Sequence, residues 1–255
     1  VSDEDKTRIK ISNPLLQETS CLRNNIWQEH IKICNQNIRA GRESCWIFET
    51  GNIFIDKTSN NQIEILSGAI SGNNYDEKWE LSGKTCELNY YQARGKLRQV
   101  LSHLNITVID KPTDKYEYLH PGRTSILIIE GKEAGYFGQI NPKYIAEKKV
   151  LSNLYLFSVD IDKVLQAATR TNKWTPIFKA YPIVPKIERD INFIFSKEYL
   201  VSDILVSIKK FGKNILEEVK LIDIYNDSNF GDKFISYTFR LSYRDKERTL
   251  VENDV

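Results

Sequence analysis

The segment RTSILIIEGKEAGYFGQI, residues 123–140, decides the fold class of the first part of this chain. Two apolar runs flank Gly131 and Lys132, and a glycine between two such runs typically marks a tight turn between antiparallel strands. We therefore expect a β-hairpin. A hairpin joins neighbouring strands without a crossover helix, so the surrounding sheet is expected to be mainly antiparallel.

The elements predicted around the hairpin alternate irregularly between helices and strands. Two segments have apolar residues at helical spacing, and the first is expected to end at Gly41. The predicted elements are helices at 18–40 and 88–104, two short strands at 44–57 that pivot at Gly51, a strand at 60–72, and a strand that runs into a helix at 153–168. Since hairpins rather than βαβ repeats connect them, the pattern indicates an α+β domain on a mainly antiparallel sheet.

A proline-rich segment, residues 169–188, follows this domain. It contains three of the seven prolines and little periodicity, which is typical of a linker. We place the boundary at its start, which gives a first domain of residues 1–167 and a second of residues 168–255.

The second domain has a regular order of elements. Its patterns predict a strand at 189–195, a helix at 199–211, strands at 219–227 and 235–244, and a second helix that begins at Thr249. Strand, helix, strand, strand, helix is the order of a ferredoxin-like βαββαβ domain without its last strand. We expect such a truncated domain, with helices on one sheet face and the other face open.

The period of two assigns side chains to the two faces of this sheet. Apolar residues are expected to face the helices, namely Ile191, Phe193, Phe195, Tyr237, Phe239, Leu241 and Tyr243. The same alternation leaves on the open face Asp190, Asn192, Ile194, Ser236, Thr238, Arg240, Ser242 and Arg244. The predicted open face is therefore largely polar.

Composition excludes several classes of protein. With 255 residues, of which 41% are hydrophobic and 27% charged, the chain is ordinary in composition. No apolar run approaches the roughly 18 residues of a membrane-spanning helix. A net charge of +2 does not by itself indicate a nucleic-acid partner, and the four cysteines and three histidines are too scattered for a zinc site, so we expect no metal. The lack of methionine and the helix expected at the last residues suggest a fragment of a longer chain.

Several motifs, taken in order, resemble the β subunit of phenylalanyl-tRNA synthetases. They are NPLL (13–16), CLR (21–23), FETG (48–51), LHPGR (119–123) and GYFGQINP (135–142), followed in the second domain by RDINFIF, LIDIYND and FRLSYRDKERTL. Each motif alone is weak, but their order along nearly the whole chain is specific. The resemblance is to the C-terminal third of the family's β chain. The residues of these motifs look most similar to those of cyanobacterial and plastid members.

The resemblance implies a partner and a division of roles. The family's enzyme is an (αβ)2 heterotetramer whose α subunit holds the catalytic site, with ATP and Mg²⁺ bound there. The first domain resembles the inactive, class II synthetase-like module of the β chain, and the sequence contains no Gly-x-Gly of a class II ATP site. Arg94 and Arg98 in ARGKLRQ are interpreted as solvated residues of a helix, and we assign no catalytic residue.

The second domain resembles the family's ferredoxin-fold anticodon-binding domain, which implies tRNA(Phe) as a partner. The family's editing site is expected to lie outside the residues present. The resemblance also implies a compartment with its own translation, either bacterial cytoplasm or plastid stroma.

Candidate RNA-binding residues lie in the second domain and candidate subunit contacts in the first. Hydroxyl, amide and guanidinium groups suit hydrogen bonds to splayed bases and phosphates, and the candidates are Arg189, Asn192, Ser236, Arg240 and Arg244. For the α subunit the candidates are Arg23, expected on the helix face opposite Leu22 and Ile26, and His120 and Arg123, which a Pro-Gly turn would present together. An ordinary solvated residue, or turn chemistry alone, is the alternative in each case.

A protein of another class is the rival interpretation. It would be a non-enzymatic binding protein, in which a ferredoxin-like module binds RNA or a small ligand beside an inert α+β scaffold. The first domain separates the two interpretations, because a stand-alone binding module has no need of the motif series from residue 13 to residue 142.

Overall fold

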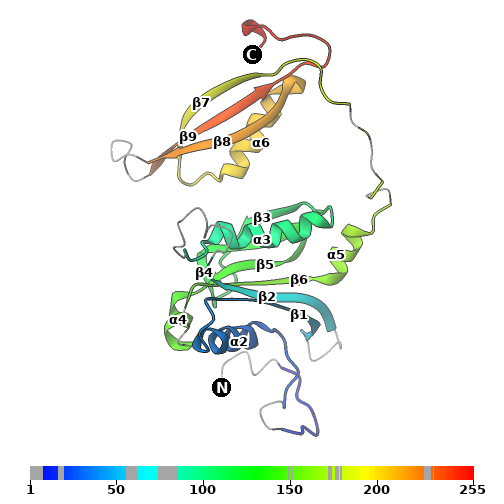
Figure 1. Cartoon of the computed structure of the whole chain (residues 1–255), viewed down its shortest axis with the longest axis vertical. Coiled ribbons are helices and arrows are strands. Elements are labelled where there is room, and N and C mark those ends of the chain that lie inside the picture. Colours follow the sequence, from blue (N-terminus) through cyan, green and yellow to red (C-terminus); the bar gives the residue numbers. More distant parts are fainter. Residues whose placement is uncertain are drawn as a thin grey trace. The chain divides into compact units, whose positions relative to one another are not determined.

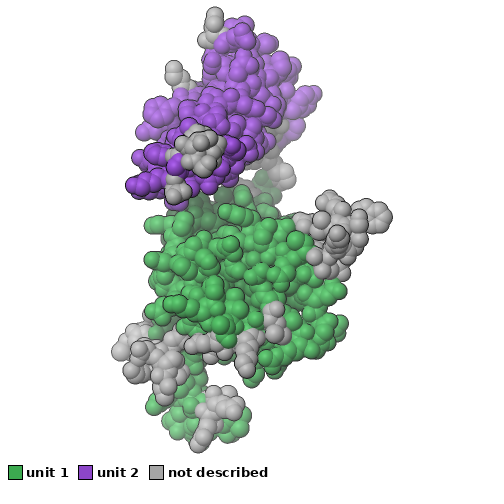
Figure 2. Space-filling model, turned by 90° about the vertical axis from the view of Figure 1, so that its left-hand side faces the viewer, with its two compact units in different colours: residues 1–175 green, residues 176–255 purple. Residues whose placement is uncertain are grey.

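The computed structural model divides the chain into two compact units, Val1–Thr175 and Pro176–Val255 (Figures 1 and 2). The proline-rich segment predicted from the sequence spans the point of division. The structure describes residues 8–16, 20–55, 62–73, 86–148, 150, 152–171, 174–175, 178, 180–226, 231 and 233–255.

The first unit is built on a six-stranded sheet in which every neighbouring pair is antiparallel (Figure 1). In their order across the sheet, the strands are β1 (Ser44–Phe54), β2 (Gln62–Gly72), β6 (Leu154–Asp160), β5 (Lys132–Ile140), β4 (Leu119–Ile129) and β3 (Val108–Pro112). The predicted α+β class with a mainly antiparallel sheet is confirmed.

The predicted hairpin joins β4 and β5. Ile129 pairs with Lys132, so Glu130 and Gly131 form a two-residue turn. Their φ angles are 50° and 80°, and two positive φ angles in succession match the turn type whose twist suits a hairpin. Glycine meets this requirement without a steric penalty.

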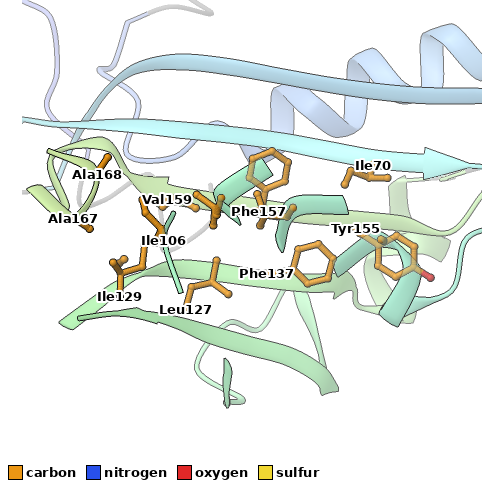
Figure 3. Packing of buried hydrophobic residues seen from close by; sticks show 14 of the residues in the cluster. Ile70, Ile106, Leu127, Ile129, Phe137, Tyr155, Phe157, Val159, Ala167 and Ala168 are labelled. Atoms are coloured by element: carbon orange, nitrogen blue, oxygen red, sulfur yellow. The ribbon is translucent and has the colours of Figure 1, made fainter. Parts of the chain in front are cut away.

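Helices cover both faces of this sheet. One face packs on α2 (Trp27–Arg39) and α4 (Pro142–Lys148), and the other on α3 (Tyr90–His103) and α5 (Ile161–Ala168). The central strand β6 is therefore buried on both sides: Leu154 and Leu156 join the α2 cluster, while Phe157 and Val159 join the α3 cluster. Figure 3 shows part of the α3 cluster, in which Phe157 and Val159 lie with other buried side chains of β5 and β6.

The second unit is a three-stranded antiparallel sheet with one helix packed on it. The strand order is β7 (Ile187–Ser196), β9 (Phe234–Tyr243) and β8 (Leu216–Tyr225), and α6 (Val201–Phe211) precedes a short 3₁₀ turn (Lys213–Ile215). The core contains Ile204 of α6 together with Val219, Tyr237, Phe239 and Leu241 of the sheet. The predicted strand, helix, strand, strand order and the alternation along β9 are confirmed.

Two predictions near the start of the chain are wrong. Residues 18 and 19 of the expected first helix lie outside the described residues, and residues 20–26 are not helical: Leu22 N–H donates to the Ile9 carbonyl, and the helix begins only at Trp27. β1 is one continuous strand and does not pivot at Gly51. A Cβ at Gly51 would clash with the guanidinium of Arg23, so this glycine leaves room for a side chain rather than for a bend.

The helix predicted from Thr249 is also absent from the described residues. Asp245 accepts hydrogen bonds from the backbone N–H groups of Glu247 and Arg248, which closes a turn instead. Arg248 then forms two 2.8 Å hydrogen bonds with the Asp254 carboxylate, beside a 3₁₀ turn at Glu252–Asp254.

Candidate functional site

The candidate RNA-binding site is the sheet face of the second unit that lies opposite α6. In the β7–β9 register Asp190 faces Arg240, Asn192 faces Thr238 and Ile194 faces Ser236. β9 is the middle strand, and its other neighbour places Lys220 beside Arg240 and Tyr225 beside Ser236. Each row across this face therefore contains one side chain from each of three strands.

Arg240 is held by its cross-strand neighbour. Its Nε and Nη2 donate to the two carboxylate oxygens of Asp190 at 2.8 and 2.7 Å. These hydrogen bonds, together with the opposite charge, lower the pKa of Asp190 below its usual value and raise the pKa of Arg240. The guanidinium is thus fixed in direction, and the carboxylate of Asp190 balances its charge.

The next row is a chain of hydrogen bonds. Asn192 Nδ2 donates to Thr238 Oγ1 at 2.8 Å, and Ser236 Oγ donates to Asn192 Oδ1 at 2.9 Å. Asn192 is exposed, but Ser236 is buried, and so is Ser242 near the other end of β9. Ser236, a predicted RNA contact, is therefore less accessible than its place on the open face suggests, because short side chains on a middle strand are covered by the longer side chains of both neighbouring strands.

The other two predicted RNA contacts lie apart from this row. Arg189 is paired with Leu241, which belongs to the core on the α6 side, and its Nη2 lies 3.3 Å from Glu252 Oε1. Arg244 follows β9, and its Nε lies 2.9 Å from Glu217 Oε2. The five predicted residues therefore do not form one patch.

Charge on the candidate face is balanced by ion pairs. Lys220 Nζ lies 2.9 Å from Glu218 Oε2, and Lys186 Nζ lies 2.6 Å from Glu188 Oε1. Because these cations are paired with carboxylates, the face does not present a cluster of free positive charges to phosphates. It presents hydrogen-bonding groups that are fixed in direction.

An apolar row at one end of the face was not among the predicted site residues. Ile194, Ser236 and Tyr225 lie side by side across the three strands, and about half of the surface of Ile194 and of Tyr225 is exposed. With Ser236 buried between them, Ile194 and Tyr225 supply the exposed surface of this row. The alternation along β7 exposes Ile194, but only the register with β8 places Tyr225 beside it.

The predicted subunit contacts of the first unit lie apart, with Arg23 beside β1 and with His120 and Arg123 in β4. Arg23 precedes α2 and does not project from a helix: its Nη1 donates to Glu49 Oε1 at 2.7 Å and its Nε to the Asn52 carbonyl at 3.1 Å. His120 and Arg123 lie in an irregular part of β4, between the paired residues Leu119 and Thr124, rather than in a turn between elements. The sheet order places three strands between β1 and β4.

Internal hydrogen bonds hold the two β4 side chains. His120 Nδ1 accepts from the Gly122 N–H at 3.0 Å, and Arg123 Nη1 donates to Gln139 Oε1 at 2.8 Å. Gln139 Nε2 in turn donates to Asn153 Oδ1 at 3.0 Å. Arg123 therefore begins a polar chain that crosses from β4 through β5 to the start of β6.

The described part of the chain contains neither a metal-binding cluster nor a membrane-spanning helix. Within the described ranges, no three or more His, Cys, Asp and Glu side chains are grouped so that they could hold a metal ion. None of the helices in those ranges has the length and apolar character that a membrane crossing requires.

Two protein families match the chain in succession. Residues 1–161 match the family described as the phenylalanyl tRNA synthetase beta chain CLM domain, and residues 182–255 match the ferredoxin-fold anticodon binding domain. The first match covers the motif series that a stand-alone binding module would not need, so the rival interpretation is not favoured.

Individual relatives agree with these matches. A phenylalanine–tRNA ligase beta subunit of Prochlorococcus marinus (strain MIT 9312) is 62% identical over all 255 residues, and one of Synechococcus sp. (strain CC9902) is 41% identical. The chain spans 31% and 32% of the lengths of these two relatives. The crystal structure of pyrrolysyl-tRNA synthetase from Desulfitobacterium hafniense has a TM-score of 0.44 and 14% identity, over 64% of this chain and 53% of that one. The similarity of all 255 residues to these relatives agrees with the family match over residues 1–161, and that match, which covers more than half of the chain, establishes that the chain belongs to the phenylalanyl-tRNA synthetase β-chain family.

Proposed function

We propose that this chain supports the ATP-dependent attachment of phenylalanine to tRNA(Phe) as part of the β subunit of a phenylalanine–tRNA ligase. In this proposal the first unit contributes to assembly with a catalytic α subunit in an (αβ)2 heterotetramer, and the second unit contacts the anticodon. The succession of the two matched families in one chain is the observation that supports it. The proposed setting is bacterial cytoplasm or plastid stroma.

The chemistry of the reaction is assigned to the α subunit. The described carboxylate, histidine and cysteine side chains do not form a set that fits Mg²⁺, and the arginines of the candidate face are paired with carboxylates. No step of the reaction is assigned to these residues. ATP and Mg²⁺ are expected in the partner subunit.

In this proposal the second unit makes three kinds of contact with an unstacked anticodon. The row of Ile194, Ser236 and Tyr225 provides an apolar and aromatic surface on which a flat base can stack. The neighbouring Asn192–Thr238 pair offers amide and hydroxyl groups for a base edge. Arg240 keeps N–H groups beyond those given to Asp190, and these are proposed to meet a phosphate. Stacking and shape, rather than net charge, would then dominate binding.

Reconstitution of the enzyme tests the proposal. Aminoacylation of tRNA(Phe) with phenylalanine is measured for the natural chain alone, for the α subunit alone and for the mixture. We expect activity only in the mixture, because the α subunit holds the reacting groups and the β chain completes the assembly. Activity of the β chain alone would refute the division of roles, and an inactive mixture would refute the function.

A substitution on the candidate face tests the RNA contact. Arg240→Ala is expected to weaken tRNA(Phe) binding by the assembled enzyme about tenfold or more, since a charge-assisted contact is lost, while phenylalanine-dependent pyrophosphate exchange stays unchanged. Lys209→Ala, which removes an exposed cation from α6 on the opposite face, is the matched control and should leave both quantities unchanged. Unchanged tRNA affinity in Arg240→Ala would remove Arg240 from the site.

A further inference from the structure

His30 is buried between α2 and the sheet, where it contacts β2. It is 2% exposed, and its Nε2 lies 3.2 Å from Ser67 Oγ. The Ser67 hydroxyl has one hydrogen, which it donates to the Phe157 carbonyl at 3.1 Å. Toward His30, Ser67 can therefore only accept. In the neutral ring Nε2 thus carries the hydrogen and Nδ1 carries the free lone pair.

The other ring nitrogen ends this chain of hydrogen bonds. His30 Nδ1 is buried, and none of the described residues forms a hydrogen bond with it. A neutral imidazole leaves only an acceptor unpaired here. A protonated imidazole has a second N–H group and a buried positive charge, and both need an acceptor.

The charged groups that act on His30 come from three parts of the first unit. They are Glu49 of β1, Glu29 of α2 and Arg23 of segment 20–26, which precedes α2, and in the described ranges β2 and β6 add none. Glu49 is paired with Ser67 in the β1–β2 register, so the two side chains share the sheet face that α2 covers. Glu29 is exposed to solvent. Glu49 is therefore the carboxylate best placed to accept from a protonated His30.

Arg23 already binds this carboxylate. Arg23 Nη1 donates to Glu49 Oε1 at 2.7 Å, and its Nε donates to the Asn52 carbonyl. The Arg23 carbonyl accepts from the Phe54 N–H, so its side chain and its backbone both fasten segment 20–26 to β1. The Arg23 side chain is 38% exposed, so water can solvate the guanidinium when Glu49 turns away from it.

We propose that His30 and Arg23 compete for Glu49, and that protonation of His30 releases segment 20–26 from β1. With His30 neutral, Arg23 holds Glu49 and the segment is docked. When a proton from solvent binds Nδ1, the imidazolium donates to Glu49, and the Arg23 side chain turns to water. The inference concerns the first unit alone and goes beyond the proposed function.

The direction of the pH dependence follows from the burial of His30. Burial lowers the pKa of His30 below its ordinary value of about 6.5, and Glu49 opposes this shift. The stability that depends on neutral His30 is therefore complete above about pH 6.5, the pKa in the unfolded chain. It is lost as the pH falls through the lower pKa of the folded chain, and segment 20–26 should open in that range.

Amide hydrogen exchange of the natural full-length chain tests the opening at Phe54, whose N–H is bound to the Arg23 carbonyl. Its protection factor, which corrects for the pH dependence of free exchange, should fall at least about threefold between about pH 7.5 and about pH 5. In His30→Gln it should stay constant, because the amide can donate to Ser67 but does not titrate. A constant value in the unmodified chain, or an equal fall in His30→Gln, overturns the proposal.

The pKa of His30 tests the competition itself, and deuterium exchange at its ring Cε1–H, followed by mass spectrometry, measures it. Arg23→Gln should raise this pKa, since Glu49 is then free to pair with the imidazolium. Glu49→Gln should lower it, since the accepting carboxylate is lost. Glu64→Gln changes an exposed carboxylate of β2 and is the matched control, which should leave the pKa unchanged. An unchanged pKa in Arg23→Gln overturns the competition, even if His30→Gln does not fold.

Discussion

Each unit of the chain contains an arginine and an aspartate joined by two hydrogen bonds, and the two pairs differ in burial rather than in geometry. Arg94 Nε and Nη2 lie 2.7 and 3.0 Å from the Asp110 carboxylate, and Arg240 Nε and Nη2 lie 2.8 and 2.7 Å from that of Asp190. The Arg94 side chain is 8% exposed, whereas that of Arg240 is 42% exposed. The same chemistry therefore supports packing in the first unit and orients a surface group in the second.

The surroundings of the first pair explain its structural role. Arg94 lies on α3 with its guanidinium carbon 5.9 Å from the centre of the Phe137 ring, and Asp110 lies on the edge strand β3. Ser125 of β4 also donates a hydrogen bond to Asp110 at 3.0 Å. The pair fastens a helix to the last two strands of the sheet. Arg240 and Asp190, in contrast, fasten two strands that the backbone already pairs.

The largest effect is expected from Asp110→Ala. This change leaves the buried Arg94 guanidinium without its counter-ion, which should lower the free energy of unfolding of the first unit by about 2–3 kcal/mol, below the usual range for a fully buried pair because Asp110 itself is partly exposed. Urea unfolding followed by tryptophan fluorescence measures it, since all four tryptophans belong to residues 1–175.

A second substitution identifies the cause of that loss. In the Asp110→Ala background, Arg94→Met removes the unpaired charge and should restore part of the stability, because an apolar side chain of similar length is tolerated in the same space. A loss below about 0.5 kcal/mol in Asp110→Ala would mean that the pair is no more important than an ordinary surface pair.

The sequence predicts the environment of Arg240 correctly but not that of Arg94. The alternation along residues 235–244 places Arg240 on the open face and Phe239 in the core, as the structure has them. The helical pattern at residues 88–104 also identifies α3, which Asn89 and Gln92 begin with a reciprocal capping box. Yet the interpretation of Arg94 as solvated is wrong. Helical spacing places Arg94 three and seven residues before the buried Leu97 and Leu101, at the border of the apolar face, but its partner Asp110 lies on another element and cannot be identified from the helix alone.

The candidate site shows the same limit. Periodicity assigns side chains to a face, but it does not say which of them bond to each other. The pairing of Arg240 with Asp190, the covering of Ser236 and the position of Tyr225 beside Ser236 all follow from the register of three strands, which no single segment contains. Arg189 is a predicted RNA contact, although the period of two that places Asp190 on the open face places Arg189 on the other face.

A smaller effect is expected when the exposed pair is broken. Asp190→Ala should change the stability of the second unit far less than Asp110→Ala changes that of the first, because water solvates the exposed Arg240 once its partner is removed. The second unit contains none of the tryptophans, so fluorescence does not measure its stability. Hydrogen exchange at the slowest amides of β9 measures it instead. A loss as large as that of Asp110→Ala would contradict the distinction between the two pairs.

The smallest effect is a shift in one titration, and its sign follows from the pairing. Two hydrogen bonds from Arg240, and then its charge, stabilise the ionised Asp190 carboxylate, so its pKa in the folded chain lies below the usual value of about 3.9. The stabilisation is present above the pKa of the unfolded chain and is lost as the pH falls through the lower folded pKa. NMR titration of the Asp190 carboxyl carbon should show this depressed pKa, and in Arg240→Gln the pKa should rise toward the ordinary value. Lys209→Ala should leave it where it was, since that cation lies on α6 at the other face. If Asp190 has an ordinary pKa in the unmodified chain, its two hydrogen bonds with Arg240 do not persist in solution. The guanidinium of Arg240 would then have no fixed direction toward a phosphate.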